Sequence, residues 1–406
     1  MLNTVVVVGA GQAAAVAART LRRRGFDGRI ELVGDELDRP YQRPPLSKEY
    51  LETGSDEDLY LLGEQWCAES GVDLRLGTQV SRLDPGTGSV VLADGTALDA
   101  DAVLLATGGR PRRLPGVDGT RVHTLRTRAD ADRLRESLRP GARIVIVGAG
   151  FIGAEVASTA RARGADVVVL DALDVPMSGV LGARMGAVCA QLHRAHGVEL
   201  RLGEPVESVV EGRSGVTVRT ASGWRTDADA VVVGAGIVPA VEVAERSGIA
   251  VRDGILVDAS GRTSMPNVYA AGDVANHDHP LFGTRIRAEH VEAANRLATV
   301  AADTMLGREA VFADPHWFWS DQYGTNLQFT GYAADHDRIV LRGTPDEFDF
   351  CAFYLRDGVV RAAFAAERGE DVVAAKELIG RAQRVDPAVL ADPGADLMDL
   401  AMEGVS

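Results

Sequence analysis

The most constraining feature of the sequence is one motif that occurs twice, 139 residues apart. The first copy, TVVVVGAGQAAAVAARTLRRRG, spans residues 4–25, and the second, RIVIVGAGFIGAEVASTARARG, spans residues 143–164. Each copy is a run of β-branched residues, then a glycine turn, then an alanine-rich stretch that predicts a helix. Aligning the copies superposes Gly9 on Gly148, Gly11 on Gly150, and Ala14 on Gly153.

This pattern is the fingerprint of a βαβ unit that binds a dinucleotide. The first glycine permits the tight turn, the second lets the backbone approach a pyrophosphate, and the third position must be small for helix and strand to pack. The phosphates then lie against the helix N-terminus, where N–H groups and the helix dipole favour negative charge. Because the motif occurs twice in one register, the sequence predicts two bound dinucleotides and an enzyme that passes electrons between them.

An acidic residue follows the second strand of each unit. In the first unit this is Asp35, with Glu36 as the alternative, because the strand end is uncertain by a residue or two. In the second unit it is Asp171, which can accept hydrogen bonds from both ribose hydroxyls and repel a 2′-phosphate. The next residues, Ala172 to Asp174, include no arginine, so the sequence predicts NADH rather than NADPH as the reductant.

Each unit leads through short strands to a similar closing strand. These are DAVLLATGGRP at 101–111 and DAVVVGAGIVP at 229–239. The stretch 254–275 then ends a strand in Gly-Asp, at Asp273, and a helix is expected over 287–306. From Asp314 the sequence changes to HWFWSDQ and alternating strands, which indicates a C-terminal α+β domain.

Composition limits the partners and the chemistry. A net charge of −15 argues against nucleic acid or anionic membrane as the main partner. No apolar run approaches the ~20 residues of a membrane span, and a strand begins almost at the N-terminus, so we expect a cytoplasmic protein without a signal peptide. Three widely spaced cysteines, Cys67, Cys189 and Cys351, argue against a zinc site, an iron–sulfur site or a redox dithiol, and we expect no bound metal.

The segment RPYQRPPLSKEYL, residues 39–51, places the cations Arg43 and Lys48 close behind the first unit. Its proline pair is expected to prevent a helix before Leu46, with a start near Ser47–Lys48. The simple interpretation is a loop that starts a helix. The functional one assigns Arg43 to phosphate neutralisation, for which its planar guanidinium is suited.

Taken in order, the motifs resemble those of the FAD-dependent NAD(P)H reductases with the glutathione-reductase-like fold, and most closely the oxygenase-coupled ferredoxin reductases. The resemblance covers essentially the whole chain. The matching segments are Gly9–Ala14, Arg43–Lys48, Ala106–Gly109, Gly148–Glu155, Ala271–Val274 and Trp317–Gln322.

The resemblance implies an α/β chain with two Rossmann-like domains and a C-terminal α+β domain. The FAD-binding domain would be split into 1–109 and 240–313, with the NAD-binding domain at 110–239 and the C-terminal domain at 314–406. FAD would be bound by Gly9, Gly11, Ala14, Asp35, Arg43, Lys48, Thr107, Gly108, Asp273 and Val291. NAD would be bound by Gly148, Gly150, Ile152, Gly153, Glu155, Asp171 and Gly236.

The resemblance also suggests catalytic residues. Related disulfide reductases carry a CxxxxC pair where this chain has PPLSK, so electrons must leave from the flavin itself. We expect Lys48 to favour the reduced flavin and to pair with Glu155, on the first turn of the NAD-binding helix. The alternative is a glutamate that only stabilises its helix N-terminus.

Two further positions are interpreted in the same way. Trp319 in HWFWSDQ would lie near the flavin edge that faces the electron acceptor; the alternative is a strand that packs both its tryptophans into a core. After Arg287 the family often has an aromatic residue where this chain has Glu289, His290 and Val291. The backbone N–H of Val291 could still meet a flavin carbonyl, and His290 could be only a polar helix residue.

The implied reaction takes a hydride from NADH to FAD and passes single electrons to a 2Fe–2S ferredoxin. That ferredoxin would serve a haem monooxygenase or a ring-hydroxylating dioxygenase. Rubredoxin reductase and monodehydroascorbate reductase on the same scaffold remain alternatives, as does a flavoprotein of the apoptosis-inducing-factor group with an interaction role. The sequence leaves a monomer and a homodimer equally open.

Overall fold

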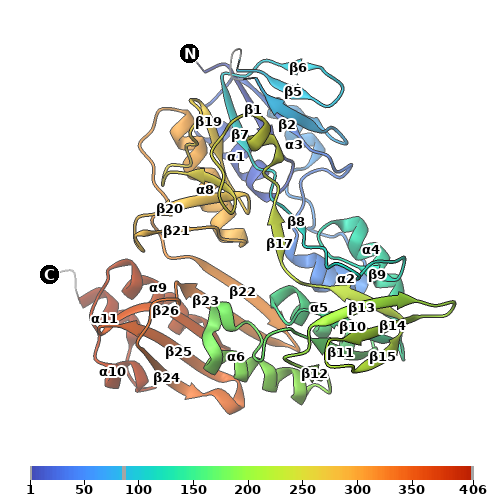
Figure 1. Cartoon of the computed structure of the whole chain (residues 1–406). Helices are drawn as coiled ribbons and strands as arrows, with labels where there is room; N and C mark the ends of the chain where they lie inside the picture. The colour runs from blue at the N-terminus through green and yellow to red at the C-terminus, as the bar shows by residue number, and fades with distance from the viewer. Residues whose placement is uncertain (1, 85–87, 404–406) are drawn as a thin grey trace. The chain divides into compact units, whose positions relative to one another are not determined.

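The two copies of the glycine motif fall in different parts of the computed structural model, which describes residues 2–84 and 88–403. The chain divides into two compact units, and Figure 1 labels their elements. Unit 1 comprises Met1–Gln42, Asp56–Arg110 and Val238–His316. Unit 2 comprises Arg43–Ser55, Pro111–Ile237 and Trp317–Ser406.

The first copy of the motif builds a five-stranded parallel sheet in unit 1, in the order β19-β7-β1-β2-β3. Its central strand β1 is a run of valines that are almost completely buried, as expected for a parallel strand covered on both faces. The strands are β1 (Thr4–Val8), β2 (Arg29–Val33), β3 (Val72–Arg75), β7 (Ala102–Leu105) and β19 (Val268–Ala270).

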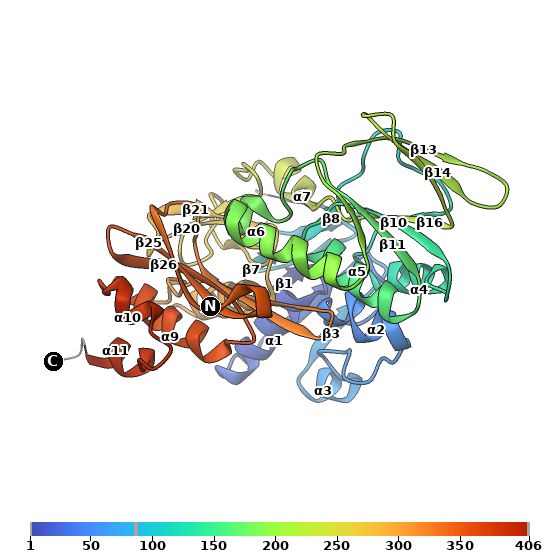
Figure 2. The same cartoon turned by 90° about the horizontal axis from the view of Figure 1, so that it is seen from below.

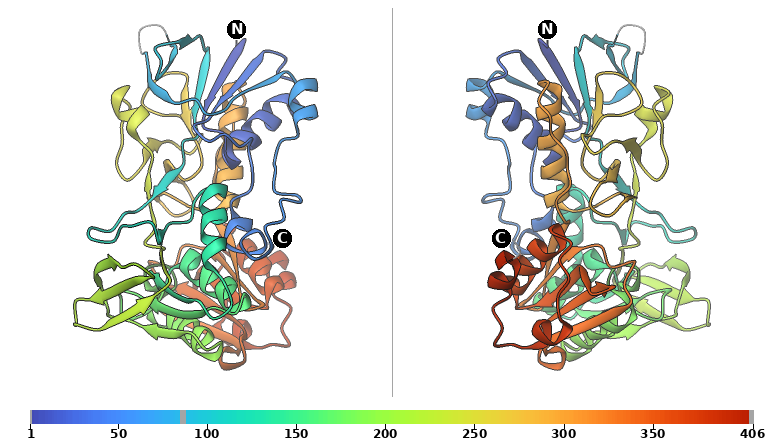
Figure 3. Two further views of the ribbon diagram at one scale, coloured as in Figure 1. Left: turned by 90° about the vertical axis from the view of Figure 1, so that its right-hand side faces the viewer. Right: turned by 90° about the vertical axis from the view of Figure 1, so that its left-hand side faces the viewer.

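Two alanine-rich helices of unit 1, α1 (Gln12–Arg23) and α8 (Val291–Met305), pack side by side (Figure 3). Small side chains on both helices allow this close approach. The helix expected over 287–306 begins four residues later than predicted. Residues 287–289 carry no regular structure, and His290 is extended, with φ −129° and ψ 147°, at the N-cap of α8.

The remaining elements of unit 1 are short. They form two further three-stranded sheets and two helices: β4 (Val80–Leu83), β5 (Val90–Leu92), β6 (Ala97–Leu98), β18 (Ile255–Val257), β20 (Ala275–His279), β21 (Thr284–Ile286), α3 (Glu64–Glu69) and α7 (Glu242–Arg246). Strands β8 (Gly109–Pro111) and β17 (Ile237–Pro239) form a two-stranded sheet where the chain passes from one unit to the other.

The second copy of the motif builds the equivalent parallel sheet in unit 2, in the order β12-β11-β10-β16-β9. Figure 2 labels its inner strands β11, β10 and β16. The elements of this half are β9 (Val122–His123), α4 (Arg128–Ser137), β10 (Arg143–Val147), α5 (Phe151–Ala162), β11 (Asp166–Leu170), α6 (Ser178–Ala195), β12 (Glu199–Arg201), β13 (Val206–Glu211), β14 (Val216–Thr220), β15 (Arg225–Ala228) and β16 (Ala230–Val233).

The C-terminal segment of unit 2 is an antiparallel sheet in the order β22-β23-β26-β25-β24, followed by short helices. Its elements are β22 (Trp317–Gln322), β23 (Thr325–Gly331), β24 (Arg338–Thr344), η2 (Pro345–Glu347), β25 (Asp349–Arg356), β26 (Val359–Ala366), α9 (Gly369–Gly380), α10 (Pro387–Ala391) and α11 (Leu397–Glu403). The sheet shares one buried core with α5 and α6. The predicted class, two Rossmann-like sheets and a C-terminal α+β part, is confirmed, whereas the division into three domains stays a prediction.

The proline segment differs from its prediction. A 3₁₀ turn, η1 (Pro44–Ser47), begins at the first proline, and the helix α2 (Glu49–Thr53) follows directly. Prolines at the first positions of a helical turn are tolerated, because the N–H groups they lack have no intrahelical partner there. None of the helices that the structure describes combines the length and the apolar composition that crossing a bilayer requires.

Candidate functional site

Each copy of the motif requires glycine at its first position. Gly9 has φ +123°, and a Cβ atom built there would lie 2.2 Å from the carbonyl oxygen of Ala106. Gly148 has φ +108°, and a Cβ atom there would lie 2.5 Å from the carbonyl oxygen of Gly234. No L side chain fits either position, so the sheet edge and the turn lie in backbone contact in both units.

The second and third positions behave as a phosphate cradle requires. A Cβ atom on Gly11 or on Gly150 would meet no described atom within 4 Å, so both turns leave space beside the backbone. Both glycines are N-caps without a side-chain hydrogen bond, and the first turns of α1 and α5 carry no acidic residue. At the third position, Ala14 is fully buried, and a Cβ on Gly153 would lie 2.0 Å from the oxygen of Gly148. Both helix N-termini therefore fit a pyrophosphate.

The strand order of unit 1 brings the predicted FAD residues to one sheet edge. The carboxyl ends of β1, β7 and β19 are neighbours, and they are followed by the Gly9 turn, by Thr107–Gly108 and by Asp273. The Thr107 hydroxyl donates to the carbonyl of Ala240 at 2.7 Å, and the Ala240 N–H donates to Gly108 at 2.9 Å. The Thr107 side chain thus holds the loop that borders the cradle.

The acidic residue for the FAD ribose remains open between two neighbours. Strand β2 ends two residues before Asp35, and Gly34 takes the place that Asp171 has in the second unit. Asp35 is exposed, whereas Glu36 is half-buried and accepts a hydrogen bond of 2.5 Å from the buried Tyr41 hydroxyl.

The start of α8 lies close along the chain to Asp273. His290 precedes this helix rather than lying in it, and burial lowers its pKa to about 4. Val291 is the first helical residue, and such residues have no intrahelical acceptor for their N–H groups. The geometry therefore suits the predicted backbone contact of Val291.

In unit 2 the corresponding edge carries the predicted NAD residues. Asp171 follows β11 directly; its carboxylate accepts from the N–H of Ala149 at 2.7 Å and from the N–H of Leu173 at 2.9 Å. Gly236, with φ +81°, follows strand β16, which pairs with the other side of β10 from β11. Ile152, at the start of α5, is 47% exposed.

Glu155 is the centre of a buried polar network in unit 2. Its carboxylate pairs with the Lys48 ammonium at 2.8 Å and accepts from the hydroxyls of Ser47 at 2.5 Å and Ser320 at 2.7 Å. The side chains of Glu155 and Lys48 are only 5% and 15% exposed. The ion pair expected from the sequence is therefore present, and both carboxylate oxygens are hydrogen-bonded, as a buried charge requires.

The position of Glu155 corrects one expectation. It is the fifth residue of α5, in the second turn rather than the first, and its carboxylate bonds to side chains from two other segments. A role confined to the helix N-terminus is therefore not supported. Two further hydrogen bonds hold its partners, from Thr159 to the Ser47 carbonyl and from Gln322 to the Ser320 hydroxyl.

Sequence reasoning missed Ser47 and Ser320, although both lie inside quoted motifs. The Arg43 guanidinium, five residues before Lys48, donates to the backbone carbonyl of Arg126. Its predicted contact with a phosphate stays a prediction.

The three cysteines are buried free thiols. Burial raises their pKa values, that of Cys189 to about 12, so none of the three is activated as a nucleophile.

Strand β22 presents two different faces. Trp317 and Trp319 are half-exposed and stack on each other with centroids 5.3 Å apart, whereas Phe318 is buried between Phe151 and Phe329. Phe318 belongs to the buried core cluster of this sheet, and the two tryptophans do not. Period-two alternation leaves Trp319 on the face opposite Ser320.

Comparisons with known proteins agree with this geometry. A family model described as pyridine nucleotide-disulphide oxidoreductase matches residues 3–301, and one described as reductase C-terminal matches 317–401. Rhodocoxin reductase of Rhodococcus erythropolis is 39% identical over 400 residues, covering 97% of this chain and 93% of that protein. The ferredoxin--NAD(+) reductase component of the biphenyl dioxygenase system of Paraburkholderia xenovorans is 39% identical over 405 residues, 98% of each chain.

A solved structure described as the covalent putidaredoxin reductase–putidaredoxin complex matches with a TM-score of 0.96 and 35% identity. The match covers 100% of this chain and 99% of that one. The resemblance drawn from the motifs is thereby confirmed, and with it the use of FAD and NADH. The chain belongs to the pyridine nucleotide-disulphide oxidoreductase family.

Proposed function

We propose that this protein is an FAD-dependent NADH:ferredoxin reductase that supplies a haem monooxygenase or a ring-hydroxylating dioxygenase. The observation that carries the proposal is the pair of glycine cradles, combined with a Ser47–Lys48 sequence where a disulfide reductase has its dithiol. When bound, FAD accepts a hydride from NADH and releases its electrons singly to a 2Fe–2S ferredoxin. Relatives named as ferredoxin reductases support this choice of acceptor. We also propose a cytoplasmic location, where NADH is available.

The residues of the two proposed sites are as follows. The FAD site is proposed to comprise Gly9, Gly11, Ala14, Asp35 or Glu36, Arg43, Lys48, Thr107, Gly108, Asp273 and Val291. The NADH site is proposed to comprise Gly148, Gly150, Ile152, Gly153, Glu155, Asp171 and Gly236. Asp171 selects NADH, because its carboxylate would repel the 2′-phosphate of NADPH.

Lys48 is proposed to act on the flavin through its charge. One of the three ammonium donors meets Glu155 at 2.8 Å, and the two serines fix the carboxylate in place. The remaining donors of Lys48 can therefore face negative charge that develops during reduction, without reorganising at that moment. Trp319, on the opposite face of β22 from the Glu155 network, is proposed to serve the exit of electrons toward the acceptor.

Stopped-flow measurement of the yellow protein tests the proposal. Anaerobic NADH should bleach the flavin absorbance, and a 2Fe–2S ferredoxin should restore it rapidly in one-electron steps. Rubredoxin and monodehydroascorbate serve as comparison acceptors. Slow bleaching with a long-lived charge-transfer band and no faster reoxidation by any ferredoxin would contradict the proposal and favour an interaction role.

Substituting Lys48 by Met separates its catalytic role from binding. We expect flavin reduction by NADH to slow at least tenfold, with the affinity for NADH changed far less, because the lost interaction develops only with charge on the flavin. Ser320→Ala is the matched control, since it loosens the same network without removing the cation. Flavin reduction by the Lys48 variant at the wild-type rate would remove Lys48 from the mechanism.

A further inference from the structure

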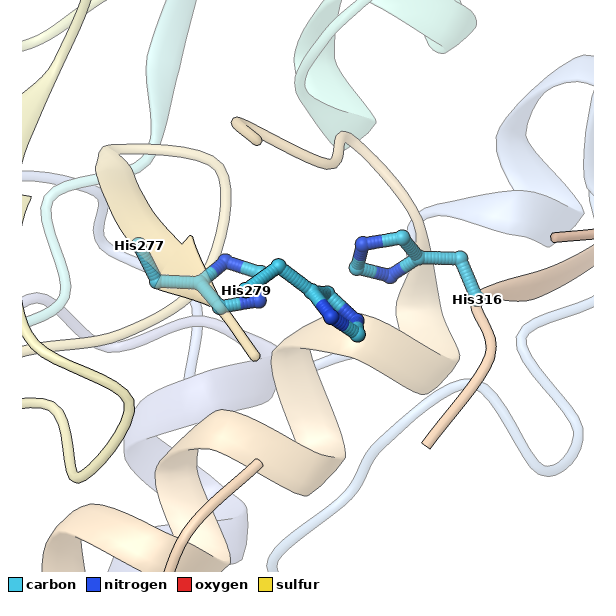
Figure 4. A group of neighbouring side chains, drawn as sticks. All are labelled: His277, His279 and His316. Carbon is cyan, nitrogen blue, oxygen red and sulfur yellow. The ribbon is translucent and has the colours of Figure 1, made fainter. Parts of the chain in front are cut away.

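Three histidine side chains converge in unit 1 (Figure 4). His277 and His279 alternate along β20, which places both side chains on one face of that strand, and His316 approaches from the segment just before β22. The nitrogen atoms that could ligate a metal lie within 4.8 Å of one another. The three residues are only 2%, 0% and 4% exposed.

Backbone carbonyls fix the orientation of two of these rings. His279 Nε2 lies 3.1 Å from the carbonyl oxygen of Asp314, and the His277 ring donates to the backbone of Ile286. A carbonyl can only accept, so the second nitrogen of each neutral ring carries a lone pair. Those second nitrogens, His279 Nδ1 and His277 Nε2, are buried and have no hydrogen-bond partner within the described residues. An imidazole anchored to a carbonyl through one nitrogen and open at the other is the arrangement of a metal ligand.

Aromatic side chains surround the three rings and keep bulk water away. Phe312 stacks on His277 with centroids 5.0 Å apart, and the Phe282 ring lies 4.7 Å from that of His279. The cluster is therefore enclosed, and the ligand nitrogens have little contact with solvent.

We propose that His277, His279 and His316 bind one zinc ion, with a fourth position open to water. The group contains imidazole nitrogens and no carboxylate, which favours zinc over magnesium or calcium. Tetrahedral ligation at about 2.0–2.1 Å places ligand nitrogens about 3.3 Å apart, so the rings close by somewhat more than 1 Å when the metal binds. The ion would tie strand β20 to the segment that ends unit 1. We expected no bound metal because the three cysteines are widely spaced. That argument did not concern a site built from histidines alone.

Titration of the untagged, flavin-loaded enzyme after treatment with a chelator tests the site. Isothermal titration with ZnCl₂ should show one ion per chain, and CoCl₂ should give the d–d absorption of a tetrahedral site. The thermal unfolding midpoint should rise on zinc addition, because a ligand that binds only the native state stabilises it. Absence of saturable binding by the wild-type protein would overturn the proposal.

Substitutions identify the ligands. His279→Gln and His316→Gln should each weaken zinc binding more than about 100-fold, beyond the loss typical of an outer-shell residue. His193→Gln is the matched control, because His193 is also fully buried but lies in α6 and bonds to the Tyr323 hydroxyl. It should leave zinc affinity unchanged. Binding that survives both cluster substitutions would overturn the assignment, and the cobalt spectrum of the wild type decides the question if either variant fails to fold.

Discussion

Replacing Glu155 by Gln would measure how strongly the buried network holds unit 2 together. The substitution keeps the size of the side chain but leaves the Lys48 ammonium, whose side chain is 15% exposed, without its counter-charge. Removing one partner of a buried ion pair destabilises by about 3–5 kcal/mol, and the residual exposure of Lys48 places this case near 3 kcal/mol. We therefore expect a clear decrease in the urea midpoint of the flavin-loaded protein, followed by tryptophan fluorescence.

A double-mutant cycle isolates the pair from other effects. Lys48→Met combined with Glu155→Gln removes both charges, so the double variant should be more stable than the sum of the single losses by about 2 kcal/mol. Glu199→Gln is the matched control, because its exposed pair with Arg143 in the same unit should contribute less than about 1 kcal/mol. Additive losses in the cycle, or a wild-type midpoint for Glu155→Gln, would refute the reasoning.

Four further predictions follow from the geometry. Gly153→Ala places a Cβ 2.0 Å from a backbone oxygen, so calorimetry should show loss of NADH binding, and urea unfolding should show a stability lower by about 1–3 kcal/mol. Gly150→Ala, whose Cβ meets no described atom within 4 Å, should weaken NADH binding without lowering stability. Asp171→Asn should lower the NADH-to-NADPH ratio of kcat/KM about tenfold or more, and an unchanged ratio would contradict the charge argument. Trp319→Ala should slow reoxidation by ferredoxin more than reduction by NADH; equal slowing of both half-reactions would count against its proposed role. Burial lowers the pKa of His193 to about 4, so below pH ~6.5 the unfolded chain binds a proton that the folded chain does not. The free energy of unfolding should therefore decrease from pH ~6.5 toward pH 4, by up to about 1.4 kcal/mol per pH unit. His193→Gln should give a flatter dependence of stability on pH.

The local geometry of this protein could be predicted from the sequence because it is set within a few residues. Gly9 and Gly148 lie in turns that exclude every other side chain, and the valine strands before them are buried as their composition indicates. The start of η1 at Pro44 was missed, because proline is unfavourable inside a helix but acceptable at its beginning. The choice between Asp35 and Glu36 was not settled, since a strand end cannot be placed to one residue from composition.

Contacts between distant segments could not be predicted in the same way. The partners of Glu155 come from residues 47 and 320, and nothing in either neighbourhood specifies that pairing. Lys48 was found only because a family resemblance placed it near the same chemistry. The histidine cluster was missed for the same reason: His277 and His279 share a strand face, but His316 joins them only through the fold.

The three separate stretches that make up unit 2 have a consequence for how the chain matures. Arg43–Ser55 leaves the ribosome first, helix α5 follows, and strand β22 emerges only near the end of synthesis. Until then the Glu155 carboxylate lacks the Ser320 hydroxyl, and Phe151 lacks the Phe318 ring that packs against it. Completion of unit 2 therefore comes late in synthesis, and a gene fragment that stops before residue 317 encodes a nucleotide-binding sheet with its principal buried charge only partly satisfied.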